Sequence, residues 1–197
     1  MARRVDGNTN WLTVAAVVAL VTGLWLAGPE VTAALRYERA AVLDGQWWRL
    51  VTGHLVHADA AHLAWNLAGA ALVWWLFGAE YGRLEWLVIV LASAAAIDIA
   101  FLGWMPGLDW YVGLSGVLHG CMAAGLAAWL ARARDPLVLL VAILFAAKLV
   151  FEHWQGPLPF TAGTLALPVV VEAHSYGAIG GLAAALAVRA RRRRAQL

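Results

Sequence analysis

A serine and a histidine stand at the starts of two apolar segments of this chain. Ser115 opens the run 115–131 directly after Gly113-Leu114, and His174 lies near the start of the run 169–190. A neutral histidine beside a serine can take the hydroxyl proton while the serine attacks a carbonyl group. Taken singly, such a serine more often bonds a carbonyl one turn back, and such a histidine more often links helices. The chemistry therefore depends on whether the fold brings the two side chains together.

Two further polar residues mark the start of the apolar run 60–79. His62 and Asn66 are four residues apart and so share one helix face. Attack on a carbonyl creates a negatively charged tetrahedral oxygen, which hydrogen-bond donors stabilise. The side chains of His62 and Asn66 and the backbone N–H of Ser115 are suited to that task. Together these residues predict a site for acyl transfer.

The composition places the chain in a membrane. It has 197 residues, of which 63% are hydrophobic, against about 45–50% in soluble domains. We expect a single domain over residues 1–197, because no linker-like or low-complexity tract interrupts the chain apart from its basic tail. The one cysteine, Cys121, excludes an internal disulfide and a cysteine-based metal cage. The basic residues cluster at the ends of apolar segments, so binding to nucleic acid is not expected.

Six apolar stretches approach the roughly 20 residues that a helix needs to cross a bilayer. They lack the period-two alternation of strands, so we predict an all-α membrane protein, a bundle of six transmembrane helices. The first stretch also resembles a signal peptide, but it lacks a convincing small-x-small cleavage site. The expected helices span residues of about 11–28, 60–79, 84–104, 115–131, 136–151 and 169–190.

The arginines predict the orientation of these helices. If six helices alternate in direction, ten arginines fall on one side, and the positive-inside rule puts both termini in the cytoplasm. The three helices that carry the candidate site then all enter from the outer face, namely 60–79, 115–131 and 169–190. His62, Asn66, Ser115 and His174 are therefore expected at one depth near that face. The ten arginines are Arg3, Arg4, Arg83, Arg132, Arg134, Arg189 and Arg191 to Arg194.

Small residues recur every fourth position in the two segments that carry the serine and the histidine. One segment has Gly116, Gly120 and Ala124, and the other has Gly177, Gly181 and Ala185. Such ridges let membrane helices approach closely. We therefore expect these two helices to pack against each other, so that Ser115 reaches His174.

The remaining polar residues within apolar segments suggest supporting roles. Asp98 is expected either to orient an imidazole or to pair with Lys148, and the pair is favoured. Asp59 is expected to cap the helix 60–79, and Glu172 to lie at the start of the helix that carries His174. The segment 152–168 is rich in proline and glycine, so it should not be helical throughout and is a candidate mobile gate.

Taken jointly, four stretches resemble the rhomboid intramembrane serine proteases. They are Trp48-Arg49, His62-Leu-Ala-Trp-Asn66, Gly113-Leu-Ser115-Gly116 and Ala173-His174-Ser-Tyr-Gly177-Ala-Ile-Gly-Gly181. The resemblance implies that Ser115 is the nucleophile, that His174 is the general base, and that His62, Asn66 and Ser115 form the oxyanion hole. It implies supporting roles for His119, Gly113, Gly116, Gly177 and Gly181, and it implies no cofactor and no metal.

One departure narrows the resemblance to the rhombosortase branch. Many rhomboids carry a tyrosine four residues after the serine, where this chain has His119, which is placed to stack on His174 or to tune its proton affinity. The branch implies a bacterial inner membrane enzyme whose site opens toward the periplasm. Its implied substrates are membrane-anchored secreted proteins that end in a Gly-Gly motif, an apolar helix and basic residues. The acyl group is then passed to water or to the amine of a lipid.

Two other classes of protein remain open. His54, His57 and His62 gather near the outer face, with His119 and His174 able to join them, and imidazoles bind zinc, copper and haem iron. A membrane metal or haem protein would fit that gathering, although the chain has no H-E-x-x-H motif and no paired intramembrane carboxylates. A catalytically inactive rhomboid-like protein that binds single helices is the other alternative. Metal analysis tests the first, and the reactivity of Ser115 tests the second.

Overall fold

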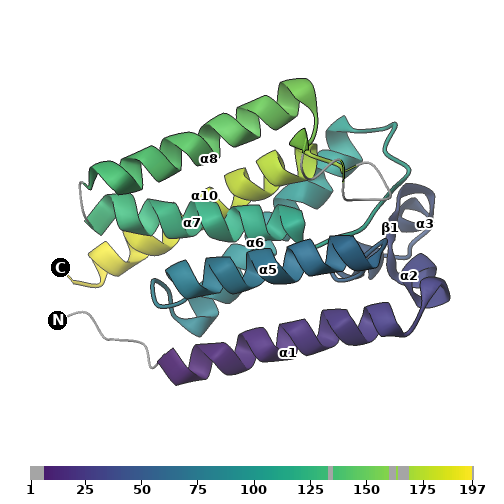
Figure 1. The fold of residues 1–197 in the computed structure, drawn as a ribbon, viewed down its shortest axis with the longest axis horizontal. Helices are drawn as coiled ribbons and strands as arrows, with labels where there is room; N and C mark the ends of the chain where they lie inside the picture. Colours follow the sequence, from purple (N-terminus) through teal and green to yellow (C-terminus); the bar gives the residue numbers. More distant parts are fainter. Residues whose placement is uncertain (1–6, 133–134, 160–162, 164–168, 197) are drawn as a thin grey trace.

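The computed structural model describes residues 7–132, 135–159, 163 and 169–196 (Figure 1). Each of its six long helices lies on one of the expected apolar runs. Arg3, Arg4 and Arg134, on which the expected orientation partly depends, lie outside the described residues. The long helices are α1 (Gly7–Leu26), α5 (Ala60–Phe77), α6 (Arg83–Trp104), α7 (Ser115–Arg132), α8 (Pro136–Gln155) and α10 (Glu172–Arg194).

Three of the described helices are long and apolar enough to cross a membrane one by one, namely α5, α6 and α8. Helix α1 and the short helix α2 (Pro29–Leu35) are together long and apolar enough for one further span, but the chain bends by 114° at the break between them. Helices α7 and α10 carry glycine, serine and histidine in place of long apolar side chains, which lowers their hydropathy. A membrane protein of several helices is what these features support, while six crossings and cytoplasmic termini stay predictions.

The centre of the bundle is the contact between α7 and α10, with α6 packed on both (Figure 1). The small-residue ridges make this contact, as their spacing predicts. A Cβ atom on Gly177 would collide with the carbonyl oxygen of Gly116, and one on Gly181 would collide with that of Gly120. The two backbones therefore touch, and no larger residue fits at either point.

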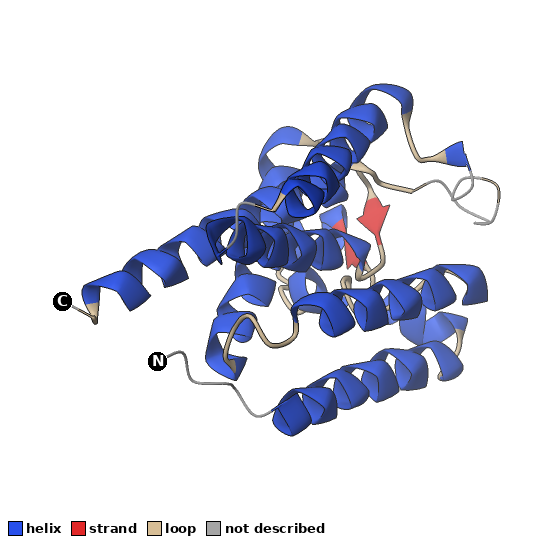
Figure 2. Ribbon diagram, turned by 60° about the vertical axis from the view of Figure 1, so that its left-hand side comes forward, coloured by secondary structure: helices blue, strands red, loops and turns tan. Residues whose placement is uncertain are grey.

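The segment 27–59, which joins α1 to α5, folds into short elements that no sequence pattern predicted. Strand β1 (Tyr37–Glu38) pairs antiparallel with β2 (Trp110–Tyr111), just before Ser115 (Figure 2). A ladder of two residues is too short to produce a visible alternation of apolar and polar side chains. The ladder ties the segment 27–59 to the chain that leads into α7. Besides α2, the short helices of this segment are α3 (Arg39–Leu43) and α4 (Arg49–Thr52).

Arg49 holds the segment 27–59 together from within. Its side chain is buried, and it donates to the side chain of Gln46 at 2.7 Å and to the carbonyl oxygens of Ala33 and Arg36 at 3.0 and 2.8 Å. A buried guanidinium is tolerated because its N–H groups find acceptors. The arginine of the Trp48-Arg49 motif is therefore a structural brace.

Helix α8 corrects one expected boundary. It does not end at residue 151 but continues to Gln155, and Gly156 follows with a positive φ of 82°. Glycine adopts a positive φ without steric cost and is common just past the end of a helix, so the signal was present in the sequence. The start of the expected non-helical segment 152–168 is thus helical. Residues 160–162 and 164–168 of the candidate gate lie outside the described residues.

The expected pair of Asp98 with Lys148 is wrong. Asp98 Oδ1 lies 3.3 Å from Nε2 of His54, whereas Lys148 pairs with Glu152 one turn further along α8. Asp98 faces the segment 27–59, because α4 of that segment packs against α6. The other expectation for Asp98, that it orients an imidazole, is what the structure shows.

The two acidic residues expected at helix starts lie there. The Asp59 side chain accepts a hydrogen bond of 2.7 Å from the backbone N–H of His62 and so caps α5. Glu172 is the first residue of α10. Both acidic residues lie where the positive end of a helix dipole favours them.

A methyl group added at Gly181 is expected to lower the stability of the bundle. Gly181→Ala forces α7 and α10 apart, and overpacking of this kind costs about 1–3 kcal/mol. The control is Gly103→Ala in α6, where an added Cβ meets nothing within 4 Å. Thermal unfolding in detergent should show a lower midpoint for the first variant only. Equal midpoints would contradict the close backbone contact.

Candidate active site

Ser115 and His174 meet across the α7–α10 contact. Ser115 is the first residue of α7, and its Oγ lies 3.0 Å from Nε2 of His174 near the start of α10. A serine side chain is short, so this distance requires the close approach that the glycines permit. His174 is only 5% exposed. The pair expected from the sequence is therefore formed, between residues that are 59 positions apart.

The turn before Ser115 is fixed by a glycine and a tyrosine. Gly113 has a φ of 121°, which side-chain-bearing residues rarely adopt, and a Cβ there would lie 2.6 Å from the His62 ring. Its backbone N–H donates to Gly53 at 3.0 Å, and its carbonyl accepts from the Tyr111 hydroxyl at 2.7 Å. Burial raises the pKa of Tyr111, so this hydroxyl stays protonated. The turn thus presents Ser115 in one orientation.

His62 and Asn66 lie across from Ser115 on α5. Asn66 is buried, and its Nδ2 donates to the carbonyl of His62 at 2.9 Å. An amide nitrogen carries two hydrogens, so this bond leaves the second one for another acceptor. Both side chains line the same cavity as Ser115.

That cavity has a volume of about 550 Å³ and is mostly apolar. Its size falls within the range of small-molecule and peptide sites. The polar groups gather at one part of its wall, and apolar side chains of α5 and α8 form much of the rest. Polar lining residues are His62, Asn66, Ser115, His119, Lys148, Glu152 and His174; apolar ones include Trp65, Leu72, Leu144 and Phe145.

His119 stacks on His174, one of the two placements expected for it. The ring centroids are 4.0 Å apart with an interplanar angle of 14°. Phe145 of α8 lies at 5.9 Å from the His119 ring. The Nδ1 atom of His119 is 2.7 Å from the backbone oxygen of Ser115. His119 therefore touches both members of the serine–histidine pair.

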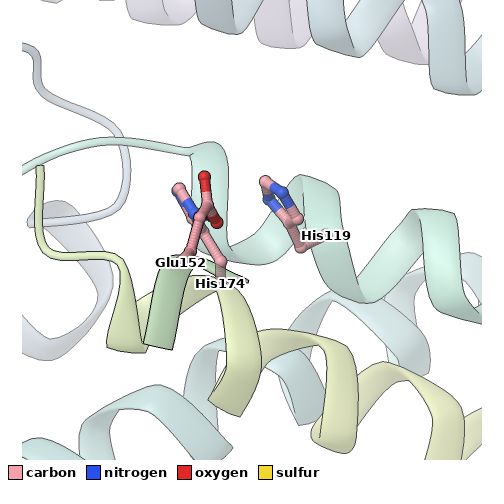
Figure 3. Close-up of side chains that lie close together, drawn as sticks. All are labelled: His119, Glu152 and His174. Carbon is pink, nitrogen blue, oxygen red and sulfur yellow. Dashed lines mark hydrogen bonds and ion pairs between the residues drawn. The ribbon is translucent and has the colours of Figure 1, made fainter. Parts of the chain in front are cut away.

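Two residues of α8, Lys148 and Glu152, join the site without having been expected there. Glu152 Oε2 lies 2.8 Å from Nδ1 of His174 and 2.6 Å from Nζ of Lys148, and Figure 3 shows the carboxylate against the His174 ring. The sequence carried two signals for them. Lys148 and Glu152 are four residues apart, which is the spacing of a helical ion pair, and Gly156 marks a helix that extends past Glu152.

The metal alternative can be tested against the donor set. Within the part of the chain that the structure describes, one group of three metal-capable side chains converges, His119, Glu152 and His174, with ligand atoms within 4.8 Å of one another (Figure 3). The ammonium of Lys148 contacts His119 Nε2 and lies 2.6 Å from Glu152 and 3.4 Å from His174 Nδ1. A cationic group of the protein thus occupies the space between these atoms, which favours a hydrogen-bonded assembly over a metal site.

The outer histidines do not join that cluster. His54 pairs with Asp98, and His57 packs edge to face on His62 with ring centroids 5.1 Å apart. His57 is 1% exposed and backs the residue expected in the oxyanion hole. Neither His54 nor His57 lines the cavity that contains Ser115.

The sequence profile described as the Rhomboid domain matches residues 44–191, which include every residue of the site. The chain belongs to the rhomboid family. Rhomboid protease GluP of Bacillus subtilis (strain 168) is 34% identical over 91 residues, which are 44% of this rhomboid but only 17% of GluP. Putative rhomboid protease YdcA of the same strain is 27% identical over 161 residues, 78% of this chain and 73% of YdcA.

The stability of this rhomboid should depend on His57 as the pH falls. Burial, with the neighbouring His62, lowers the pKa of His57 to about 4 from an ordinary 6.5. Below pH 6.5 the unfolded chain takes up a proton that the folded chain refuses, so stability present above that pH is lost toward pH 4. The loss attributable to His57 is roughly 3 kcal/mol.

His57→Phe should keep the ring and remove this loss. Thermal unfolding measured between pH 7 and pH 4.5 should show a flatter dependence than for the native protein. His153→Phe, at an exposed histidine of α8, is the control and should leave the dependence unchanged. The same slope for His57→Phe and the native protein would show that His57 is not held neutral.

Proposed function

We propose that this rhomboid is an intramembrane serine endopeptidase, with Ser115 as nucleophile and His174 as general base. The observation that carries the proposal is the 3.0 Å approach of Ser115 Oγ to His174 Nε2 on the wall of a largely apolar cavity. A binding protein has no need of a serine held against an imidazole. The names of the two relatives support the same class of activity.

The geometry supports a two-step acyl transfer. Ser115 Oγ attacks the peptide carbonyl carbon while its proton moves to Nε2 of His174. The tetrahedral intermediate collapses, the carbon–nitrogen bond breaks, and His174 returns the proton to the leaving amine. A water or an amine then attacks the ester on Ser115, gives its proton to His174, and releases the serine with that proton restored.

The tetrahedral oxygen is stabilised by donors from two helices. We assign this task to the backbone N–H of Ser115 and to the side chains of His62 and Asn66. The N-termini of α5, α7 and α10 all lie near the site, since these helices begin at Ala60, Ser115 and Glu172. Their partial positive charge adds to the stabilisation.

The substrate class follows from the rhombosortase resemblance. We propose membrane-anchored secreted proteins that are cut near a C-terminal Gly-Gly motif, with the acyl group passed to water or to a lipid amine. His119 in the place of the usual tyrosine, stacked on His174, supports this branch. The proposed location is a bacterial inner membrane, with the site opening outward. The start of α1 and the end of α10 lie at the same end of the bundle, which agrees with both termini in the cytoplasm (Figure 1).

A serine-dependent cut is the decisive test. The native protein is co-expressed with a tethered reporter that ends in Gly-Gly, an apolar helix and an arginine-rich tail. We expect Ser115→Ala to abolish cleavage, because the attacking oxygen is lost. Ser93→Ala, at a buried serine of α6 that bonds its own helix, is the matched control and should cleave normally.

Mass spectrometry of the new C-terminus then separates hydrolysis from transfer, because a transferred amine adds its mass. Cleavage by Ser115→Ala would rule out the serine mechanism. An uncut reporter with a protein that folds normally would favour the inactive helix-binding alternative.

The oxyanion assignment predicts a loss of rate without a loss of binding. Asn66→Ala removes a donor that we assign to the tetrahedral oxygen, so kcat should fall by about 10²–10³-fold with KM little changed. His62→Ala should behave in the same way. Reporter cleavage kinetics in detergent measure both constants. Unchanged kcat in both variants would remove His62 and Asn66 from the oxyanion hole.

A further inference from the structure

The hydrogen-bond roles at His174 follow from the chemistry proposed for Ser115. To take the serine proton, Nε2 must be unprotonated, so neutral His174 carries its hydrogen on Nδ1. That hydrogen needs an acceptor inside an apolar bundle. Glu152 Oε2, at 2.8 Å from Nδ1, is that acceptor. The base is thus held in the useful tautomer by a residue of a third helix.

Glu152 differs from the rest of its own helix in burial. Of the 20 residues of α8, all of them described, only Glu152 is buried. The other side chains of α8 are exposed or half-buried, as expected for a helix that faces lipid. A carboxylate buried in such a helix is costly and indicates a specific role.

Lys148 keeps that carboxylate charged. Its Nζ lies 2.6 Å from Glu152 Oε2, one helical turn away. A buried carboxylate without a partner tends to take up a proton, and Glu152 would then lose its strength as an acceptor. The ammonium lies 3.4 Å from His174 Nδ1, but both atoms carry hydrogen, so they make no hydrogen bond. The lysine therefore acts on the carboxylate.

His119 links this ion pair back to the serine. The backbone oxygen of Ser115 only accepts, so Nδ1 of His119 donates to it over 2.7 Å. Nε2 of His119 then has a lone pair and accepts from the Lys148 ammonium, which contacts it. The bonds run from Ser115 through His174, Glu152, Lys148 and His119 and return to Ser115. One assignment of hydrogens satisfies all five links.

We propose that Glu152 is a positioning residue of this site, which holds His174 with Nε2 toward Ser115, and that Lys148 and His119 close a ring that holds Glu152. This inference rests on the proposed function and extends the serine–histidine pair to a triad. The imidazolium that forms during attack lies next to the Glu152 carboxylate. Its charge is therefore stabilised where it appears.

The test compares Glu152→Gln with the native full-length protein in detergent. A fluorophosphonate is the probe, since the serine oxygen attacks its phosphorus and fluoride leaves. We expect Glu152→Gln to slow labelling and to lower kcat for the reporter by about 10²-fold or more, with KM within about threefold. Glu30→Gln, at an exposed glutamate of α2, is the matched control. It should keep native rates.

The outcomes separate the two proposals. If labelling depends on Ser115 but the labelling rate of Glu152→Gln is within about threefold of the native rate, the triad is overturned and the serine–histidine pair stands. A raised KM with unchanged kcat would also overturn the positioning role. A native protein that neither labels nor cleaves would overturn the proposed function and the triad with it.

Lys148 is tested by a second pair of variants. Lys148→Met should slow labelling about 10-fold or more, since Glu152 loses the charge that keeps it ionised. The double variant with Lys148→Met and Glu152→Gln should label about as slowly as Glu152→Gln alone, because both changes act through one carboxylate. The double variant also carries the test if Glu152→Gln alone fails to fold, since it removes both charges of the Lys148–Glu152 pair. A double variant with native rates would overturn the proposal.

Discussion

The backbone contact between α7 and α10 is the constraint on which the rest of this structure depends. Where Gly177 and Gly181 meet the carbonyl oxygens of Gly116 and Gly120, the helix axes come as close as two backbones allow. Only at that separation does a side chain as short as serine reach an imidazole on the neighbouring helix. The contact also leaves no space for side chains between the helices, so Ser115 and His174 lie at the end of the contact, beside the cavity.

Helix α8 depends on this centre differently. It packs loosely on α7 and α10, and its apolar side chains gain little from burial in the bundle compared with lipid. Its specific attachment, near its C-terminal end, is polar, through the ion pair of Lys148 and Glu152 and their bonds to His119 and His174. Hydrogen bonds that order the site thus also fix the position of the helix that carries them.

The sequence predicted the parts of this arrangement that follow from regular patterns. Apolar length located the helices, glycine spacing located the α7–α10 contact, and matched positions at helix starts brought Ser115 near His174. What it missed depends on contacts between irregular segments. Asp98 was assigned to Lys148 because no sequence pattern shows that the segment 27–59 folds back and brings His54 to Asp98. Glu152 was missed because α8 was ended one turn too early, which placed it in a loop.

The charges of the site explain why an ion pair is placed beside a histidine that must stay neutral before the reaction. A lone carboxylate at this depth would be protonated, and the base would then lose its strong acceptor at Nδ1. Lys148 balances the carboxylate in advance, so the assembly carries no net charge until Ser115 attacks. During attack a positive imidazolium and a negative oxygen appear together, each beside groups already oriented toward it. Little rearrangement is then required when the new charges form, because an ordered ring of hydrogen bonds already surrounds His174.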